Sequence, residues 1–226
     1  MSKHLERDLK HIEKELLTVG TLVEEAINKA MTSLIDKNEE LANEVIAGDK
    51  KIDAKEVEIE EHCLKVLALN QPLASDLRFI ITVLKVNNDL ERMGDHAVNI
   101  AKRARHIARD EGLVIPVDFR PIAESVRTMV SKSLDALVNV DIRLAKKILE
   151  DDDIVDEQNK KMIRELIAIM KEHPASIPSC MDMVSASKQL ERVGDLATNI
   201  AEDIIFMVEG DVVRHRAHRI HRDPVR

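Results

Sequence analysis

The chain has 226 residues, a formal net charge of -8, 34% charged residues and only 1% aromatic residues. This composition argues against a general nucleic-acid-binding protein, which needs a basic face for phosphates and rings on which bases stack. No apolar run approaches membrane-spanning length and no apolar signal region opens the chain, so we expect a cytoplasmic protein that does not insert into a membrane.

In the first half, apolar residues recur at alternating spacings of four and three over about residues 4–47, which predicts one long helix. Gly48 is expected to end this helix, and Asp49 to cap a second one that runs to about residue 70. A Gln-Pro pair then interrupts the pattern. A third helix is predicted from Ser75 to about residue 112.

The same plan repeats in the second half. We predict a fourth helix from 122 to about 140, a fifth over about 152–173 and a sixth over about 177–208. The expected fold is all-α, with two tandem antiparallel three-helix bundles related by an internal repeat, each burying its own apolar seams. The predicted division is residues 1–112 for the first bundle, 113–121 for a linker, 122–210 for the second bundle and 211–226 for a basic flexible tail.

The repeat is clearest in a twelve-residue segment, 90–101, which recurs at 190–201 with nine identities. Both acids, the arginine, the glycine and the asparagine are retained. In a helix whose apolar seam includes Leu90, the acids of this segment lie away from the seam and form an outer polar ridge. Gly94 and Gly194 each cost about 1 kcal/mol relative to alanine in a helix interior, so we expect a neighbouring helix to approach closely there.

Helices two and five, aligned at an offset of 103, share only two residues over positions 49–70, and both are aspartates. In an antiparallel hairpin these aspartates fall within about one turn, roughly 5.4 Å, of the acidic ridge. Each half therefore gathers four candidate metal-binding carboxylates. They are Asp49, Asp53, Glu91 and Asp95 in the first half, and Asp152, Asp156, Glu191 and Asp195 in the second.

Two acids spaced by four residues usually form only a solvated helix face. Four convergent acids in each of two halves must instead be protonated, neutralised by cations or bound to metal, because neighbouring carboxylates raise each other's pKa. An all-oxygen set suits magnesium, calcium, manganese or oxidised iron better than a structural zinc. His96 could add a nitrogen ligand in the first half only, since Leu196 replaces it in the second, but a surface histidine is the simpler interpretation.

Other chemistry is not indicated. There is no glycine-rich phosphate loop, Ser-His-Asp arrangement or reactive-cysteine motif, so we do not expect an enzyme. Cys63 and Cys180 lie in apolar helical stretches and are expected to be buried thiols. The basic run 102–106 is expected to complement a helix C-terminus rather than to bind phosphate. The basic residues of the tail fit a mobile end, or a contact with acidic lipid or a partner.

The segment Gln-Pro-Leu-Ala-Ser-Asp-Leu-Arg at 71–78, followed by Asn-Asp-Leu-Glu-Arg-Met-Gly-Asp-His at 88–96, resembles the PhoU family of bacterial phosphate-signalling proteins. The resemblance covers about residues 3–210. It implies two tandem three-helix bundles, frequently dimeric, whose eight acids named above hold multinuclear metal clusters. Iron is the favoured metal, with manganese, magnesium and zinc as alternatives.

The resemblance also implies a function: a negative regulator of the phosphate-starvation response and of phosphate transport. Such a protein would be an adaptor between the ATPase of the phosphate ABC transporter and a sensor histidine kinase, a homodimer, and peripheral at the inner membrane through these partners. Two alternatives from other classes remain open at this point. A carboxylate-bridged metallohydrolase would need an open metal position in a concave pocket, and a purely structural helical scaffold would not need eight repeated acids.

Overall fold

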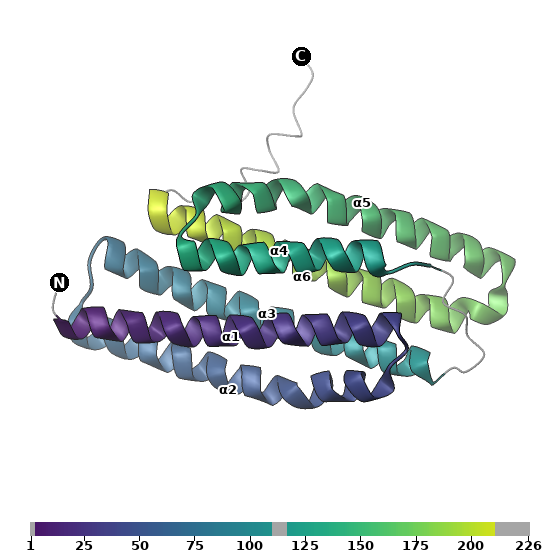
Figure 1. Cartoon of the computed structure of the whole chain (residues 1–226), viewed down its shortest axis with the longest axis horizontal. Helices are drawn as coiled ribbons and strands as arrows, with labels where there is room; N and C mark the ends of the chain where they lie inside the picture. The colour runs from purple at the N-terminus through teal and green to yellow at the C-terminus, as the bar shows by residue number, and fades with distance from the viewer. Residues whose placement is uncertain (1–2, 110–116, 211–226) are drawn as a thin grey trace, which may run out of the picture.

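The protein folds as an elongated bundle of long helices, seen in a computed structural model that describes residues 3–109 and 117–210 (Figure 1). The α-helices are α1 (Lys3–Ile35), α2 (Glu39–Asn70), α3 (Ser75–Ala108), α4 (Arg120–Asn139), α5 (Ile142–Glu172) and α6 (Ile177–Glu209), with a 3-10 turn, η1 (Pro174–Ser176), before α6. The predicted all-α fold of two tandem three-helix units is confirmed. Helices α2 and α5 lie at opposite edges of the molecule.

Two predicted segments fall wholly or partly outside the described residues: the tail 211–226, and residues 113–116 of the linker. Within the described ranges, none of the helices has an apolar stretch long enough to cross a bilayer.

The prediction of a single first helix up to residue 47 is wrong. The chain turns at residues 36–38, where Lys37 adopts a left-handed φ of 52° and the Asn38 side chain accepts a hydrogen bond of 2.9 Å from the backbone N–H of Leu41. This Asn38 cap lies eleven residues before the predicted cap, Asp49. Gly48 consequently lies inside α2, and Asp49 is a mid-helix residue rather than a cap.

The fifth helix also begins ten residues before its predicted start. The Asp141 side chain caps α5 by accepting from the backbone N–H groups of Arg143, at 2.9 Å, and of Leu144, at 3.1 Å. Val140, at the predicted end of the fourth helix, follows that helix in a left-handed conformation and is exposed. The hairpins α1–α2 and α4–α5 are thus closed by the same kind of turn, in which an unusual left-handed residue precedes a capping Asx residue.

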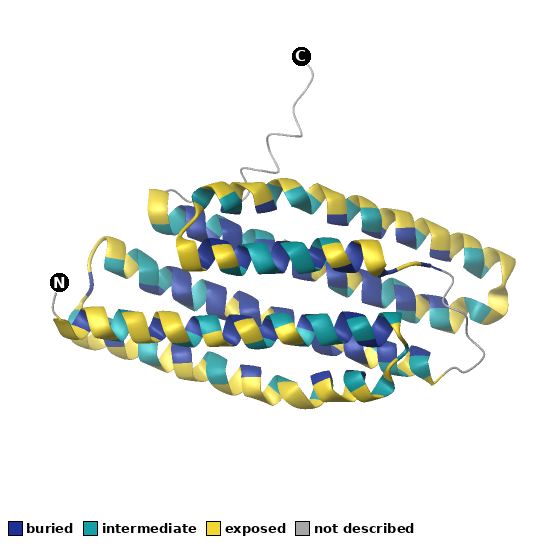
Figure 2. Cartoon of the chain, in the orientation of Figure 1, coloured by how far each residue is buried: buried dark blue, intermediate teal, exposed yellow. Residues whose placement is uncertain are grey.

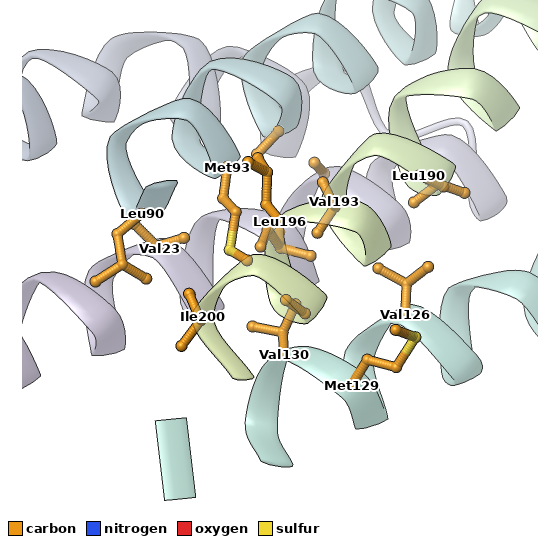
Figure 3. Close-up of a cluster of buried hydrophobic side chains, with 14 of the residues drawn as sticks. Val23, Leu90, Met93, Val126, Met129, Val130, Leu190, Val193, Leu196 and Ile200 are labelled. Atoms are coloured by element: carbon orange, nitrogen blue, oxygen red, sulfur yellow. The ribbon is translucent and has the colours of Figure 1, made fainter. Parts of the chain in front are cut away.

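The prediction that each three-helix unit buries its own apolar seams is wrong. The two units share one continuous hydrophobic core. Figure 3 shows its centre, where Met93 of α3 lies beside Leu196 of α6, with Val130 of α4 nearby and Val23 of α1 on the other side. All four side chains are almost fully buried. Burying one such side chain contributes roughly 1.5–3 kcal/mol, so the repeated segments at 90–101 and 190–201 also hold the two units together.

Polar contacts fix the antiparallel register of α3 against α6. Lys85 Nζ lies 2.9 Å from Oδ1 of the buried Asp203, and Arg103 Nη1 lies 3.1 Å from Asp182 Oδ1. His106 Nδ1 lies 3.8 Å from the other Asp182 oxygen. Two side chains of the basic run 102–106, Arg103 and His106, therefore contact one aspartate of the opposite unit, which is a structural role. Figure 2 shows the complementary pattern, with buried faces turned inward and much of α2 and α5 exposed.

Candidate metal centres

Each acidic ridge lies against a neighbouring helix at a glycine. A Cβ added to Gly94 would lie 3.2 Å from Ile52 Cδ1 and 3.7 Å from Asp49 Oδ1. At Gly194 a Cβ would lie 3.5 Å from Val155 Cγ1 and 3.8 Å from Asp152 Oδ1. The predicted close approach is confirmed at both positions, and it brings an aspartate of the outer helix onto the repeated segment in both halves.

In the first half, the four predicted acids lie near enough to repel one another. The pKa of the Glu91 carboxyl is raised above its ordinary value by partial burial and by the charges of Asp95 and Asp53, with Asp49 adding to the effect. The pKa of Asp49 is raised by partial burial and by Asp53 and Asp95, while Lys102 opposes the shift. Helices α2 and α3 thus present one connected cluster of negative charge. From here on, the first acidic ridge means the acids of both helices, and the second acidic ridge means the corresponding acids of α5 and α6.

A fifth acid, Glu56 of α2, belongs to this first cluster and was missed by the sequence comparison. Its pKa is raised by partial burial and by Glu60 and Asp53, and its own charge raises the pKa of Glu91. Glu56 was overlooked because the aligned residue in the second half is Asn159. The spacing of four and then three from Asp49 through Asp53 to Glu56 places all three on one helix face and could have identified it.

The second cluster is less negative and better partnered. The pKa of Glu191 is raised by partial burial and by Asp156 and Asp195, but Lys188 and Lys160 lower it. Asn159 Nδ2 donates a hydrogen bond of 2.7 Å to Glu191 Oε2. The buried Ser187 hydroxyl in turn donates to Asn159 Oδ1 at 2.6 Å. In the second half, an amide donor therefore occupies the position of the carboxylate Glu56, and two lysines lie close to the remaining acids.

The chemistry of these donors fits hard cations. All eight predicted residues, and Glu56, offer carboxylate oxygens, and a bound cation would offset the mutual repulsion that raises their pKa values. No three of the eight carboxylates have oxygens within 4.8 Å of one another. A single cation bound by three of these carboxylates would therefore require their side chains to rotate inward.

His96 is not the surface histidine predicted from the sequence. It is half-buried between the two units, and its Nδ1 lies 2.7 Å from Gln189 Oε1. Its pKa is lowered by burial, and the cations Arg192 and Arg92 lower it further. His96 therefore contributes to the contact between α3 and α6.

Both cysteines are buried free thiols, as predicted. Burial raises the pKa of the Cys63 thiol to about 12. It therefore stays protonated at neutral pH and is a poor nucleophile.

Comparison with known proteins extends the resemblance over nearly the whole chain. The family described as the PhoU domain matches residues 16–104 and again residues 119–204. A relative from Pseudomonas putida, named a phosphate-specific transport system accessory protein PhoU homolog, is 40% identical over 95% of this chain and 84% of its own length. A homolog of the same name from Aquifex aeolicus is 41% identical, over 93% of this chain and 95% of its own.

Solved structures agree with the fold. The crystal structure of PhoU from Pseudomonas aeruginosa superposes with a TM-score of 0.88 at 38% identity, covering 91% of this chain and 99% of that one. The phosphate transport system regulatory protein PhoU from Streptococcus pneumoniae gives a TM-score of 0.87 at 31% identity, covering 92% and 99%. These proteins are named as accessory or regulatory proteins, which confirms the prediction that the chain is not an enzyme and leaves the metallohydrolase alternative without support.

Proposed function

This chain belongs to the PhoU family, and we propose that it is a negative regulator of the phosphate-starvation response and of phosphate transport. The observation that carries the proposal is the match to relatives named as phosphate-specific transport system accessory proteins, which extends over both repeats at about 40% identity. Similarity over the full set of six helices supports transfer of the role more strongly than a match to one domain would.

In this proposal the protein acts in the cytoplasm as an adaptor between the ATPase of the phosphate ABC transporter and a sensor histidine kinase. It reaches the inner membrane only through these partners. When phosphate is plentiful, it holds the kinase in its phosphatase state and restrains transport. An adaptor of this kind works through its surfaces, and the exposed faces of α2 and α5, on opposite edges of the bundle, can be contacted independently. We further propose a homodimer as the working form.

We also propose that each acidic ridge binds a metal cluster, with iron favoured and manganese, magnesium or zinc as alternatives. The ligands are Asp49, Asp53, Glu91 and Asp95 in one half and Asp152, Asp156, Glu191 and Asp195 in the other. Bound cations would supply positive charge that neutralises the clustered carboxylates. The side chains of two helices would then share one set of cations, so metal binding would tie α2 to α3 and α5 to α6.

The regulatory proposal is tested by deleting the gene and restoring it on a plasmid. In phosphate-rich medium the deletion strain should express a phosphate-starvation reporter that the parent strain represses, and the wild-type gene should restore repression. A restored variant lacking all eight acids separates the roles of fold and metal, provided that circular dichroism shows it to be helical. Normal repression in the deletion strain would contradict the proposed function.

The adaptor proposal needs a direct test of the partners. The tagged full chain should capture the transporter ATPase and the sensor kinase from phosphate-replete cells. The same chain carrying an unrelated tag sequence is the control for non-specific capture. Recovery of neither partner from cells in which repression is intact would contradict the adaptor role while leaving the regulatory role standing.

A further inference from the structure

Two histidines and a glutamate meet between α1 and α2, away from the acidic ridges. His11 and Glu15 are one turn apart on the same face of α1, and His62 reaches them from α2. His62 Nδ1 lies 2.6 Å from Glu15 Oε2, and His11 Nε2 lies 3.6 Å from Glu15 Oε1. Among the described residues, this is the one group of three histidine, cysteine or acidic side chains whose ligand atoms all lie within 4.8 Å of one another.

The surroundings of Glu15 favour a bound cation, in addition to Lys55, whose pKa the charge of Glu15 helps to raise. Its side chain is only 16% exposed, and the ion-pair partners it has are the two histidines. A largely buried carboxylate is costly unless a positive charge or several hydrogen bonds compensate it. A protonated histidine can supply that charge, and so can a metal ion bound by all three side chains.

Two imidazoles and one carboxylate form a donor set that suits zinc and related divalent transition metals. In a tetrahedral site with bonds of about 2.0–2.1 Å, ligand atoms are about 3.3 Å apart, and here one ligand atom from each of the three residues lies within 4.8 Å of the other two. The His11 and His62 rings are tilted by 50° with their centroids 5.3 Å apart, so the two imidazoles lie next to each other at Glu15. Small side-chain rotations would therefore close the set around one ion.

A cavity of about 260 Å³ opens beside the group and provides the remaining coordination position. His11 and His62 both line it, so a metal between them would face this space and could retain a water molecule or a small anion. Arg7, Asp8 and Lys65 also line the cavity. Asp8 pairs with Arg7 at 3.6 Å, so the charge left to favour an anionic fourth ligand is mainly that of Lys65. Three protein ligands with one open position are the arrangement of zinc sites that hold water or another small molecule as the fourth ligand.

We propose that His11, Glu15 and His62 form a binding site for one divalent transition-metal ion, independent of the acidic ridges. His62 lies nine residues beyond Asp53 on α2, which at 1.5 Å per residue is about 13 Å along the helix. The site belongs to the first half alone. At the offset of 103, Val114, Asp118 and Glu165 stand where His11, Glu15 and His62 would repeat, so neither histidine has an equivalent in the sequence of the second half. A metal here would fasten α1 to α2.

The test uses the purified full chain, stripped of metal and titrated with Co²⁺. Four-coordinate Co²⁺ with nitrogen ligands absorbs visible light intensely, whereas Co²⁺ surrounded by six oxygens absorbs weakly, so the spectrum separates this site from the carboxylate ridges. One equivalent should give the intense spectrum, and Zn²⁺ should displace it. Affinity should fall about tenfold or more in His62→Gln and in Glu15→Gln, since each loses one of three protein ligands.

Two controls keep the test specific. His173→Gln removes an exposed histidine at the end of α5, and Asp152→Asn with Asp156→Asn alters an acidic ridge; both should keep the intense spectrum. Because His62→Gln could disturb the helix pair, its helicity is checked, and Zn²⁺ should raise the melting temperature of the wild type but not of this variant. An intense spectrum retained at unchanged affinity in His62→Gln, or absent from the wild type, would overturn the proposal and leave the proposed regulatory function untouched.

Discussion

Asn159 donates a hydrogen bond of 2.7 Å to Glu191, at the position where the first half of the chain carries the carboxylate Glu56. This pair makes the two acidic ridges unequal. The first ridge has five neighbouring acids, and the second has four acids, an amide and the nearby lysines Lys160 and Lys188. The two candidate metal sites, which look equivalent from the repeated segments, therefore differ in charge.

The difference predicts that the first ridge binds hard cations more tightly. Glu56→Asn should weaken Mn²⁺ binding at the first ridge by several-fold, because it removes one oxygen ligand and one negative charge. Conversely, Asn159→Glu should strengthen Mn²⁺ binding at the second ridge, because it adds a carboxylate. Calorimetric titration of the two variants and the wild type measures both effects. Identical titrations for all three proteins would show that this position takes no part in metal binding.

The two glycines at the helix crossings predict different responses to alanine. At Gly194 the added methyl would meet Val155 at an ordinary contact distance of 3.5 Å, so Gly194→Ala should raise the free energy of unfolding by about 0.5–1 kcal/mol through helix propensity. At Gly94 the methyl would lie 3.2 Å from Ile52, which must shift. Gly94→Ala should therefore raise the free energy of unfolding by less than Gly194→Ala does, or lower it.

Urea unfolding of the metal-free proteins measures this difference between matched variants. Equal stabilisation by the two alanines would show that α2 does not constrain Gly94 more tightly than α5 constrains Gly194.

His96 predicts a pH dependence of stability. Its folded pKa lies below the ordinary value of 6.5, so the unfolded chain binds more protons between these two values. The stability associated with neutral His96 is present above pH 6.5 and is lost as the pH falls through the folded pKa. His96→Leu, which copies Leu196 of the second half, should remove this component.

Metal-free protein unfolded in urea at about pH 7.5 and about pH 5.5 provides the measurement. The wild type should lose more stability over this interval than His96→Leu. The exposed-site variant His173→Leu should follow the wild type. A His96→Leu variant that loses as much stability as the wild type would contradict the assignment.

The apolar periodicity of the sequence predicted the six-helix fold correctly. It did not predict where the turn between the first two helices of each half lies. The apolar pattern continues in phase through residues 36–38, because Leu34 before the turn and Val45 after it are both buried. The turn depends instead on Asn38 and its equivalent Asp141, which cap α2 and α5 at the same offset of 103. Extending the comparison of the halves back to these residues would have found the shared cap. Gly48 was misleading because a glycine inside a helix resembles a helix end.

Comparison of the two halves of the sequence finds only some residues of the candidate sites. Identity between the halves identified Asp49 and Asp53 because both halves use an aspartate there, and it missed Glu56 because the halves differ at that position. The group of His11, Glu15 and His62 has no repeat and joins residues 47 positions apart, so only the packing of α1 on α2 brings it together. The shared core between the units was likewise not expected, because the apolar seams alone do not specify which helices they face.

Each half of the protein is proposed to have its own metal site, built across two helices. The most direct test measures bound iron or manganese after Asp49→Asn with Asp53→Asn, in a His62→Gln background that removes the proposed third site. Bound metal should fall by about half, with the site of Asp152, Asp156, Glu191 and Asp195 still occupied, and the mirror variant Asp152→Asn with Asp156→Asn should retain the other half. Full metal content in the Asp49 and Asp53 variant, or complete loss of metal, would contradict the account.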